Sequence, residues 1–207
     1  MVKIGIIGAG RMGKAHAGHL RKNPDCEIYG VYDAVPETAQ AFAQDFGAPK
    51  VYSSSAELAQ DKAVDGVLIC NYCDQHYATL VEMLNAGRKR IFCEKPLVRR
   101  LADGEALLKQ VQKAGAQIMV GHHRRYQPGY VKLRELIESG ELGPIRMVKV
   151  AGCSAAYSRE WGTYFADFER CGGVILDMET HHLDLLNWYF GLPQEVQGRS
   201  LRFPREM

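Results

Sequence analysis

A glycine-rich segment lies between a strand-like run and a helix-like run at the start of the chain. Residues 8–13 read Gly-Ala-Gly-Arg-Met-Gly, which is the spacing G-x-G-x-x-G. The β-branched run from Val2 to Ile7 precedes this segment. Met12, Ala15 and Leu20 mark one face of the helix that follows it. A strand, a tight turn and a helix in this order predict the first βαβ unit of a parallel sheet.

The alternation of apolar runs and helical patterns continues over the first half of the chain. Short apolar runs bounded by turn residues recur at residues 2–7, 27–32, 66–70, 90–93 and 116–120. Helical patterns lie between them, at residues 36–46, from residue 54 onward, at 76–86 and around 107–111. Continuous apolar runs are typical of strands buried on both faces of a parallel sheet. The predicted fold class is therefore α/β, with a doubly wound parallel sheet of the Rossmann type over residues 1–121.

The three glycines have distinct roles in a dinucleotide site. Gly8 makes the tight turn, Gly10 lets the backbone approach a pyrophosphate, and Gly13 lets helix and strand pack closely. The pyrophosphate binds at the helix N-terminus, where free N–H groups favour anions. Asp33, twenty positions after Gly13, would accept hydrogen bonds from ribose hydroxyls and repel a 2′-phosphate. The pattern predicts NAD as cofactor, with NADP possible; the alternative is a turn without ligand in which Asp33 is only a turn residue.

The pattern changes after Gly121, where we place a domain boundary. Residues 128–139 predict an amphipathic helix, and residues 183–190 predict another. Residues 145–150 alternate like a strand, and residues 195–203 resemble an early strand of a second sheet. Between them lies an aromatic stretch with Tyr157, Trp161, Tyr164, Phe165 and Phe168. Residues 122–207 are therefore expected to begin a second, α+β domain.

Composition and charge exclude several classes of partner. The chain has 26 basic and 24 acidic side chains, a net charge of +2 that provides no electrostatic surface for nucleic acid. No apolar run approaches the ~20 residues that span a bilayer, and the chain starts directly in a strand pattern without a secretory signal. We therefore expect a cytoplasmic protein that binds neither membrane nor nucleic acid.

The cysteines do not suggest a metal site. The six cysteines lie mostly in apolar segments, where buried thiols are more common than disulfides in a cytosolic chain. Cys70 and Cys73 form a C-x-x-C without a second pair at zinc-finger spacing. We predict no bound metal.

Two further segments complete a pattern that resembles a known family. Cys93-Glu94-Lys95-Pro96 ends a buried strand, and residues 172–184 read Gly-Gly-Val-Ile-Leu-Asp-Met-Glu-Thr-His-His-Leu-Asp. With the glycine motif, these segments resemble the Gfo/Idh/MocA family of glucose–fructose oxidoreductase, inositol dehydrogenase and relatives, over essentially the whole chain. The resemblance implies an NAD(P)-dependent oxidoreductase that transfers a hydride between nicotinamide and a hydroxyl or carbonyl of a sugar, cyclic polyol or nucleotide-sugar.

The resemblance also implies site residues. Lys95, Asp177 and His181 match the family's catalytic lysine, aspartate and histidine. The implied cofactor contacts come from Gly8, Gly10, Arg11, Met12, Gly13, Asp33, Asn71, His76, Glu94 and Lys95. The chain departs from the family pattern at two places, with Glu179 where the family has glycine and Asn71-Tyr72-Cys73 where it often has Thr-Pro-Asn. The first departure affects the substrate pocket and the second the packing of nicotinamide.

Alcohol oxidation needs a proton acceptor as well as a hydride acceptor. His181 suits the general base because imidazole exchanges protons near neutral pH. Lys95 suits stabilisation of a developing alkoxide, and Asp177, four residues before His181, would share a helical face with it and orient the imidazole. In an alternative assignment, Lys95 carries the proton and His181 positions the hydroxyl. Structural roles are also open: a charged strand end for Lys95, a helix N-cap for Asp177 and a core position for His181.

The length of the chain raises a further expectation. Relatives as a rule exceed 300 residues, and their second domain is a large open sheet used for oligomer contacts. This chain stops at Met207, so we expect a truncated form of a longer protein, and a homo-oligomer formed through that sheet. Two other functions are kept open: a non-catalytic NAD-binding sensor or regulator, and a reductase of a non-sugar carbonyl or imine.

Overall fold

The computed structural model describes residues 1–152, 164 and 167–199 of the 207-residue chain. The chain divides into two compact units. The first consists of residues 1–122 and 152–180, and the second of residues 123–151 and 181–207.

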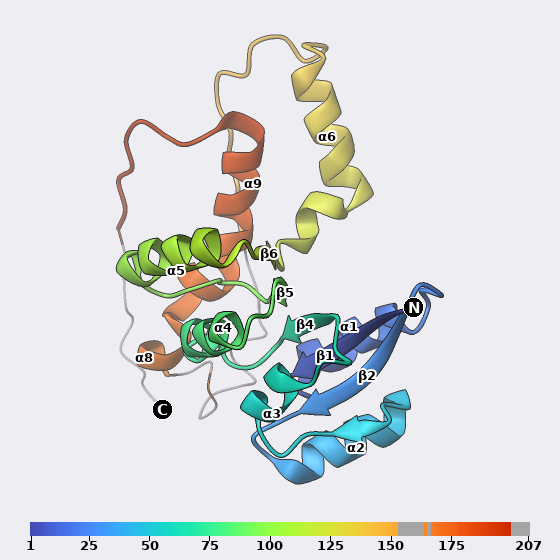
Figure 1. The fold of residues 1–207 in the computed structure, drawn as a ribbon. Helices are drawn as coiled ribbons and strands as arrows, with labels where there is room; N and C mark the ends of the chain where they lie inside the picture. The colour runs from blue at the N-terminus through green and yellow to red at the C-terminus, as the bar shows by residue number, and fades with distance from the viewer. Residues whose placement is uncertain (153–163, 165–166, 200–207) are drawn as a thin grey trace, which may run out of the picture. The chain divides into compact units, whose positions relative to one another are not determined.

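A six-stranded parallel sheet forms the centre of the first unit (Figure 1). Its strands are β1 (Val2–Ile7), β2 (Cys26–Tyr32), β3 (Lys50–Val51), β4 (Gly66–Ile69), β5 (Arg90–Cys93) and β6 (Gln117–Val120). Their order across the sheet is β3-β2-β1-β4-β5-β6, and every pair is parallel. This order, in which the winding reverses between β1 and β4, is that of a Rossmann fold and confirms the predicted fold class.

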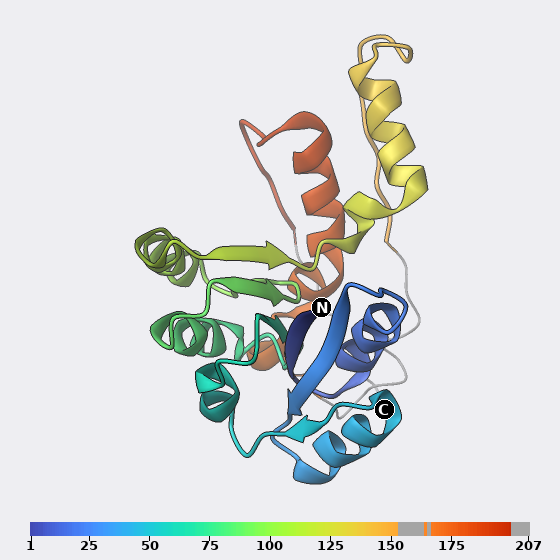
Figure 2. The same ribbon diagram turned by 45° about the vertical axis from the view of Figure 1, so that its right-hand side comes forward.

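Helices cover both faces of this sheet (Figure 2). They are α1 (Arg11–Leu20), α2 (Pro36–Phe46), α3 (Ser55–Gln60), α4 (His76–Asn85) and α5 (Leu101–Ala114). One buried cluster joins the sheet to α1 and α2, and the other joins it to α3, α4 and α5. Each helix confirms a pattern seen in the sequence, and Ser54 caps α3, because its hydroxyl accepts a hydrogen bond from the Glu57 N–H at 3.1 Å.

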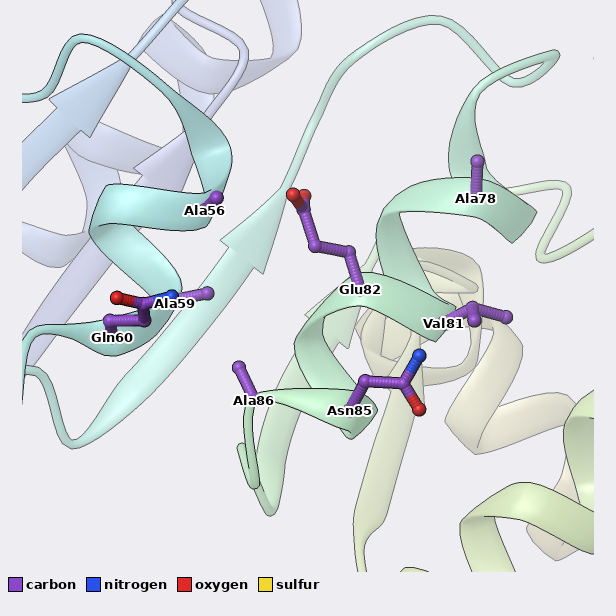
Figure 3. A pocket seen from close by; sticks show the side chains of 8 residues that line it. All are labelled: Ala56, Ala59, Gln60, Ala78, Val81, Glu82, Asn85 and Ala86. Carbon is purple, nitrogen blue, oxygen red and sulfur yellow. The ribbon is translucent and has the colours of Figure 1, made fainter.

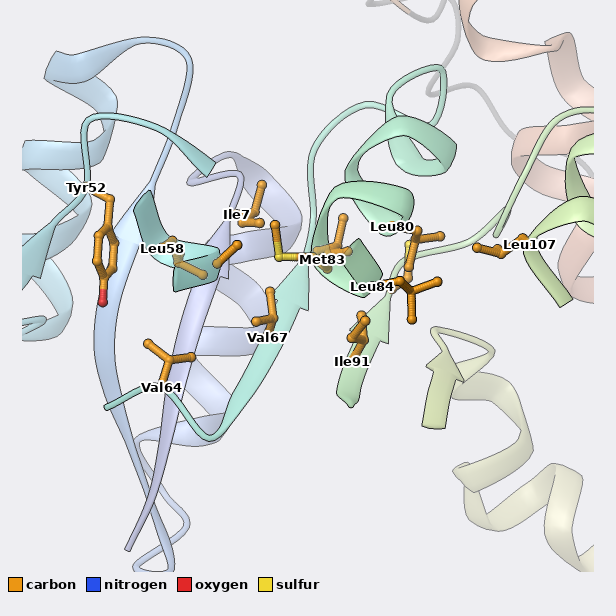
Figure 4. Packing of buried hydrophobic residues seen from close by; sticks show 13 residues of the cluster. Ile7, Tyr52, Leu58, Val64, Val67, Leu80, Met83, Leu84, Ile91 and Leu107 are labelled. Carbon is orange, nitrogen blue, oxygen red and sulfur yellow. The ribbon is translucent and has the colours of Figure 1, made fainter. Parts of the chain in front are cut away.

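The side chains of successive strand residues point to opposite faces of the sheet, and both faces are buried. This explains the continuous apolar runs. Ile6 belongs to the cluster under α1 and α2, and Ile7 to the cluster under α3 to α5. In the latter cluster, Leu80 and Met83 of α4 are fully buried near Ile7 and Ile91 (Figure 4). Because both faces of the sheet are buried, the strands show no polar alternation.

The segment after the gap in the described residues returns to the first unit. It contains the short helix α8 (Phe168–Cys171) and a π-helical turn, η3 (Ile175–Glu179). Asp167 caps α8 by accepting hydrogen bonds from the N–H groups of Glu169 and Arg170. Helix α9 (Thr180–Phe190) begins directly after the π-helical turn.

The second unit is built from helices in its described part. It contains the 3₁₀ turn η1 (His123–Tyr126), helix α6 (Pro128–Glu138) and most of α9. The Arg125 guanidinium donates two hydrogen bonds to the Asp184 carboxylate, at 2.8 and 2.6 Å. The hydroxyl of Tyr189 donates to the carbonyl of Tyr130 at 3.1 Å.

Two strands were predicted after residue 140. One is wrong, and the other lies partly outside the described residues. The predicted strand at residues 145–150 is wrong, because these residues have no regular secondary structure and Met147 is 87% exposed. Alternation alone does not make a strand, which needs a neighbour to hydrogen-bond, and residues 141–152 pair with no other described strand. Residues 195–199 are likewise irregular, whereas 200–203 lie outside the described residues, as do Tyr157, Trp161 and Phe165.

The sheet also has a strand that the sequence analysis missed. Strand β3 is two residues long and pairs with β2 through Gly30 and Val31. So short a strand carries no periodic signal. Within the described residues, no helix is long and apolar enough to cross a membrane.

The core predicts a contrast between two leucine substitutions. Leu80→Ala removes a side chain with no exposed surface and should lower the free energy of unfolding by about 2–5 kcal/mol. Leu108→Ala on α5, where the side chain is 58% exposed, should change it by less than about 0.5 kcal/mol. Urea unfolding followed by circular dichroism measures both, and equal shifts would contradict this account of the core.

Candidate active site

The loops at the carboxyl ends of β1, β2, β4 and β5 enclose a cavity of about 550 Å³ in the first unit. In open parallel sheets this edge, at the point where the winding reverses, is where ligands bind. Most of the predicted site residues line the cavity: Gly8, Gly10, Arg11, Met12, Asp33, Asn71, His76, Glu94, Lys95 and Asp177. Gly13 and His181 are not among the lining residues.

The three glycines of the turn are constrained in different ways. Gly8 has a φ of +96°, and a Cβ there would come within 2.7 Å of Cys70 and Asn71 backbone atoms. A Cβ on Gly13 would overlap the Gly8 carbonyl oxygen. A Cβ on Gly10, in contrast, would meet no protein atom within 4 Å, although Gly10 lines the cavity. The fold therefore requires Gly8 and Gly13, whereas the open space beside Gly10 fits the close approach of a ligand.

Helix α1 begins at this open turn. Its N-cap is Gly10, and no side chain caps the first turn. The uncapped N–H groups at a helix N-terminus carry partial positive charge and bind phosphate groups. The turn and α1 thus fit the pyrophosphate of a dinucleotide.

Asp33 fixes the glycine turn from the end of β2. One carboxylate oxygen accepts a hydrogen bond from the Ala9 N–H at 2.8 Å, and the other accepts from the Val35 N–H at 2.9 Å. Each oxygen retains a second lone pair for a ligand hydroxyl, and Asp33 lines the cavity. The structure thus adds a role in holding the turn to the predicted role in binding ribose.

Lys95 and Asp177 meet across 82 positions of the chain. The Lys95 Nζ donates to the Asp177 Oδ1 at 2.7 Å and to the Asp177 carbonyl at 2.5 Å. The two side chains are only 16% and 20% exposed. Lys95 follows β5, whereas Asp177 lies in the π-helical turn η3. The structure therefore brings two of the three predicted catalytic residues into one part-buried ion pair.

His181 lies in the second unit, at the start of α9. Its side chain is buried, and its ring packs edge-on against the ring of His123 with centroids 4.8 Å apart. Between Asp177 and His181 the backbone passes from π-helix to α-helix. Asp177 and His181 belong to different units, and their sharing of one helical face stays a prediction.

His76 ties the loop after β4 to the loop that carries Lys95. Its Nδ1 lies 2.7 Å from the Pro96 carbonyl, and its Nε2 lies 3.1 Å from the Asn71 carbonyl. The side chain is 1% exposed, and this burial lowers the pKa of His76. The Asn71 amide donates to the Thr79 hydroxyl at 2.9 Å. These contacts give His76 a role in shaping the cavity.

Glu94 has a partner that sequence reasoning missed. Its Oε1 lies 2.6 Å from the His16 Nε2, and its Oε2 accepts from the Lys95 N–H at 3.1 Å. Burial acts to raise the pKa of Glu94, but the His16 contact and the Lys95 N–H outweigh it, so that the pKa is lowered. Gly121 leaves room for this carboxylate, since a Cβ there would lie 3.0 Å from it. No local signal in the sequence joins His16 to a residue 78 positions away.

Two other residues of the cavity wall were not assigned from the sequence. Tyr164 and Arg170 line the same cavity as Lys95 and Asp177. Tyr164 belongs to the aromatic stretch whose role the sequence left open, and Arg170 directly precedes the Cys171-Gly172-Gly173 segment.

A second cavity, between α3 and α4, is lined mainly by small apolar side chains (Figure 3). It is lined by Ala56, Ala59, Gln60, Ala78, Val81, Glu82, Asn85 and Ala86. None of the predicted site residues borders it. The candidate site is therefore the cavity at the carboxyl edge of the sheet.

Two protein-family models match the chain. Residues 2–122 match a model described as the oxidoreductase family with an NAD-binding Rossmann fold. Residues 130–206 match a model of the GFO/IDH/MocA C-terminal domain.

Similar proteins include inositol dehydrogenases. A myo-inositol 2-dehydrogenase of Thermotoga maritima is 31% identical over 197 residues, covering 95% of this chain and 56% of the relative. An inositol 2-dehydrogenase of Rhizobium meliloti is 35% identical over 191 residues, covering 92% of this chain and 55% of the relative. The chain thus spans about half the length of these curated relatives.

Solved structures show the same similarity. A putative myo-inositol dehydrogenase from Sinorhizobium meliloti aligns with a TM-score of 0.77 at 31% identity, covering 92% of this chain and 56% of that one. The WlbA dehydrogenase from Bordetella pertussis, in complex with NADH and UDP-GlcNAcA, aligns with a TM-score of 0.80 at 28% identity, covering 92% of this chain and 55% of that one.

The glycine turn predicts that two similar substitutions differ in cost. Gly13→Ala should lower the free energy of unfolding by about 3 kcal/mol or more, because its Cβ overlaps backbone. Gly10→Ala should change it by no more than about 1 kcal/mol, because its Cβ enters open space. Thermal and urea unfolding test the contrast, and a costly Gly10→Ala would show that the fold, not a ligand, requires this glycine.

The lowered pKa of Glu94 predicts a pH-dependent contribution to stability. A depressed carboxyl pKa stabilises the fold above the unfolded value of 4.5, and this contribution disappears as the pH falls through the folded pKa. Glu94→Gln should therefore cost about 1–3 kcal/mol at pH 7 and progressively less below pH 4.5. Urea unfolding from pH 3 to pH 8 measures this, with the exposed Glu105→Gln as control. If the stability lost in Glu94→Gln grew as the pH fell, the pKa of Glu94 would be raised and not lowered, which would contradict this prediction.

Proposed function

Because the chain belongs to the GFO/IDH/MocA oxidoreductase family, we propose that it forms the cofactor site and part of the catalytic site of an NAD-dependent dehydrogenase acting on a CH–OH group. The observation that carries this proposal is the Lys95–Asp177 pair in the same cavity as the glycine turn. A cofactor-binding turn and a protonated amine at one sheet edge are what hydride transfer from an alcohol requires of a protein.

The dinucleotide is held by the residues of the first unit. Gly10 and the N-terminus of α1 would hold its pyrophosphate, and Asp33 would bind its adenosine ribose. The Asp33 carboxylate would repel a 2′-phosphate, which favours NAD over NADP. When bound, nicotinamide supplies the hydride acceptor or donor. His76, Asn71 and Glu94 shape the part of the cavity that would receive the nicotinamide.

Lys95 handles the substrate oxygen. Its ammonium has three N–H groups, of which two donate to Asp177 in the structure, and the third is available to a hydroxyl in the cavity. As the hydroxyl loses its proton, Lys95 would stabilise the developing alkoxide, from which the hydride leaves carbon to give the carbonyl. Asp177 holds the amine in place and offsets its charge. His181 is the proposed general base. In the alternative, His181 positions the hydroxyl and Lys95 carries the proton, for which its amine must first be neutral.

The substrate class is a sugar, cyclic polyol or nucleotide-sugar. Relatives are named for myo- and scyllo-inositol, and one similar structure holds UDP-GlcNAcA. Glu179, close to Asp177 in sequence, replaces a glycine of the family pattern and is a determinant of which member of this class is accepted. The domain boundary near Gly121, the homo-oligomer and the cytoplasmic location stay predictions. No observation favours the sensor or the imine reductase considered as alternatives.

Binding and turnover separate the roles of the two ends of the cavity. Lys95→Met should leave the Kd for NAD within about threefold of the original and lower hydride transfer by at least about 100-fold. Gly10→Ala should instead weaken NAD binding while lowering stability by no more than about 1 kcal/mol. Calorimetry with NAD and NADP, and hydride exchange with a panel of inositols, sugars and UDP-sugars, measure these effects.

The matched control is Lys113→Met, at an exposed position on α5. It should alter neither binding nor turnover. Equal loss of NAD binding and turnover in Lys95→Met would contradict the role assigned to Lys95, and absence of NAD binding by the unsubstituted chain would contradict the proposed function itself.

A further inference from the structure

The loop after β4 is held to a distant segment by the hydroxyl of Tyr164. This hydroxyl accepts a hydrogen bond from the Cys73 N–H at 3.1 Å and lies 2.8 Å from the Cys73 Sγ. It donates to the carbonyl of Arg170 at 3.2 Å. Burial, followed by the contact with Cys73, raises the pKa of Tyr164, so that the phenol stays neutral and serves as both donor and acceptor. One hydroxyl therefore joins the loop to helix α8.

Arg170 of α8 makes a second connection to the same loop. Its Nε donates to the Asp74 Oδ2 at 2.9 Å. Its guanidinium lies 5.3 Å from the ring centroid of Tyr72 and 5.0 Å from that of Tyr164. The two rings are stacked, with centroids 4.1 Å apart and an interplanar angle of 20°. An ion pair and two cation–π contacts thus reinforce the bonds made by Tyr164.

The backbone between Arg170 and Asp177 is short and closely defined. Gly172 and Gly173 both have positive φ, 77° and 73°. A Cβ on Gly173 would lie 2.8 Å from the Phe168 ring, so that the turn packs directly on α8. The Gly173 N–H donates to the Cys171 Sγ at 3.2 Å. The π-helical turn with Asp177 follows at once, so the location of α8 determines where Asp177 lies.

We infer that Tyr164 and Arg170 are positioning residues that dock α8 on the loop after β4 and thereby hold the Asp177 carboxylate on the Lys95 Nζ. The docking cluster consists of Tyr72, Cys73, Asp74, Tyr164 and Arg170. Lys95 approaches from β5 and Asp177 from the docked segment, so the pair depends on how the two parts of the chain are joined. The effect of this docking on catalysis rests on the proposed function. Its effect on the Lys95–Asp177 pair does not.

The chemistry of the cluster suits positioning. The guanidinium is planar, and its contacts with two stacked rings and with the Asp74 carboxylate restrict the torsions of the Arg170 side chain. Catalytic groups lose much of their effect when they move by about 1 Å. A cluster that joins Asp74 and Cys73 to the helix seven residues before Asp177 restricts such movement.

Amine labelling tests the inference without requiring turnover. Acetic anhydride modifies lysines at rates that depend on shielding of the amine, and peptide mass analysis reports Lys95 individually. Arg170→Ala, and Tyr164→Phe, which removes only the hydroxyl, should each raise the labelling rate of Lys95 at least threefold. Asp177→Asn should raise it similarly, and the double variant Arg170→Ala/Asp177→Asn should show no further rise, because Arg170 acts through Asp177. Arg21→Ala, at the exposed arginine that follows the last residue of α1, is the control.

Two further measurements distinguish positioning from general loosening. Arg170→Lys keeps a cation near Asp74 and should recover part of the protection of Lys95. Where hydride transfer is measurable, kcat should fall in proportion to Lys95 exposure. Unchanged Lys95 labelling in both Tyr164→Phe and Arg170→Ala, or additive effects in the double variant, would overturn the inference. Failure of NAD to bind would refute the proposed function and leave the labelling result unaffected.

Discussion

The close contact between α1 and the turn after β1 is the constraint on which the site depends. Gly8 and Gly13 permit this contact, because neither has space for a side chain. As a result, the N-terminus of α1 lies at the carboxyl edge of the sheet, where β1 and β4 are neighbours. A larger residue at either position would separate helix and strand, and the cavity at this edge would lose its shape.

A chain of polar contacts crosses the carboxyl edge of the sheet. The Glu94 carboxylate links α1, through His16, to the backbone of Lys95. The Lys95 amine links β5 to the π-helical turn through Asp177. Each link joins segments that are far apart in sequence, and each is at least partly buried, where electrostatic interactions are stronger than in water. The proposed cofactor end and the proposed substrate end of the cavity are thus parts of one network.

Much of the first unit was predictable because its signals are local. Continuous apolar runs reveal strands buried on both faces, and the glycine spacing reveals the turn and its ligand class. Strand β3 was missed because two residues carry no period, and the strand at residues 145–150 was wrongly predicted because alternation does not identify a pairing partner. The membership of Lys95 and Asp177 in the site followed from motif resemblance. Their ion pair, the partner of Glu94 and the docking of α8 arise from tertiary contacts across 78 to 98 positions, which no local pattern encodes.

The most direct test of the central claim is a crystal structure of the chain with NAD bound. The account predicts that the pyrophosphate lies on the N–H groups at the start of α1, that Asp33 contacts the adenosine ribose, and that the reactive face of nicotinamide points toward the Lys95 amine. A dinucleotide bound away from the glycine turn, or bound there with its nicotinamide directed away from Lys95, would contradict the account.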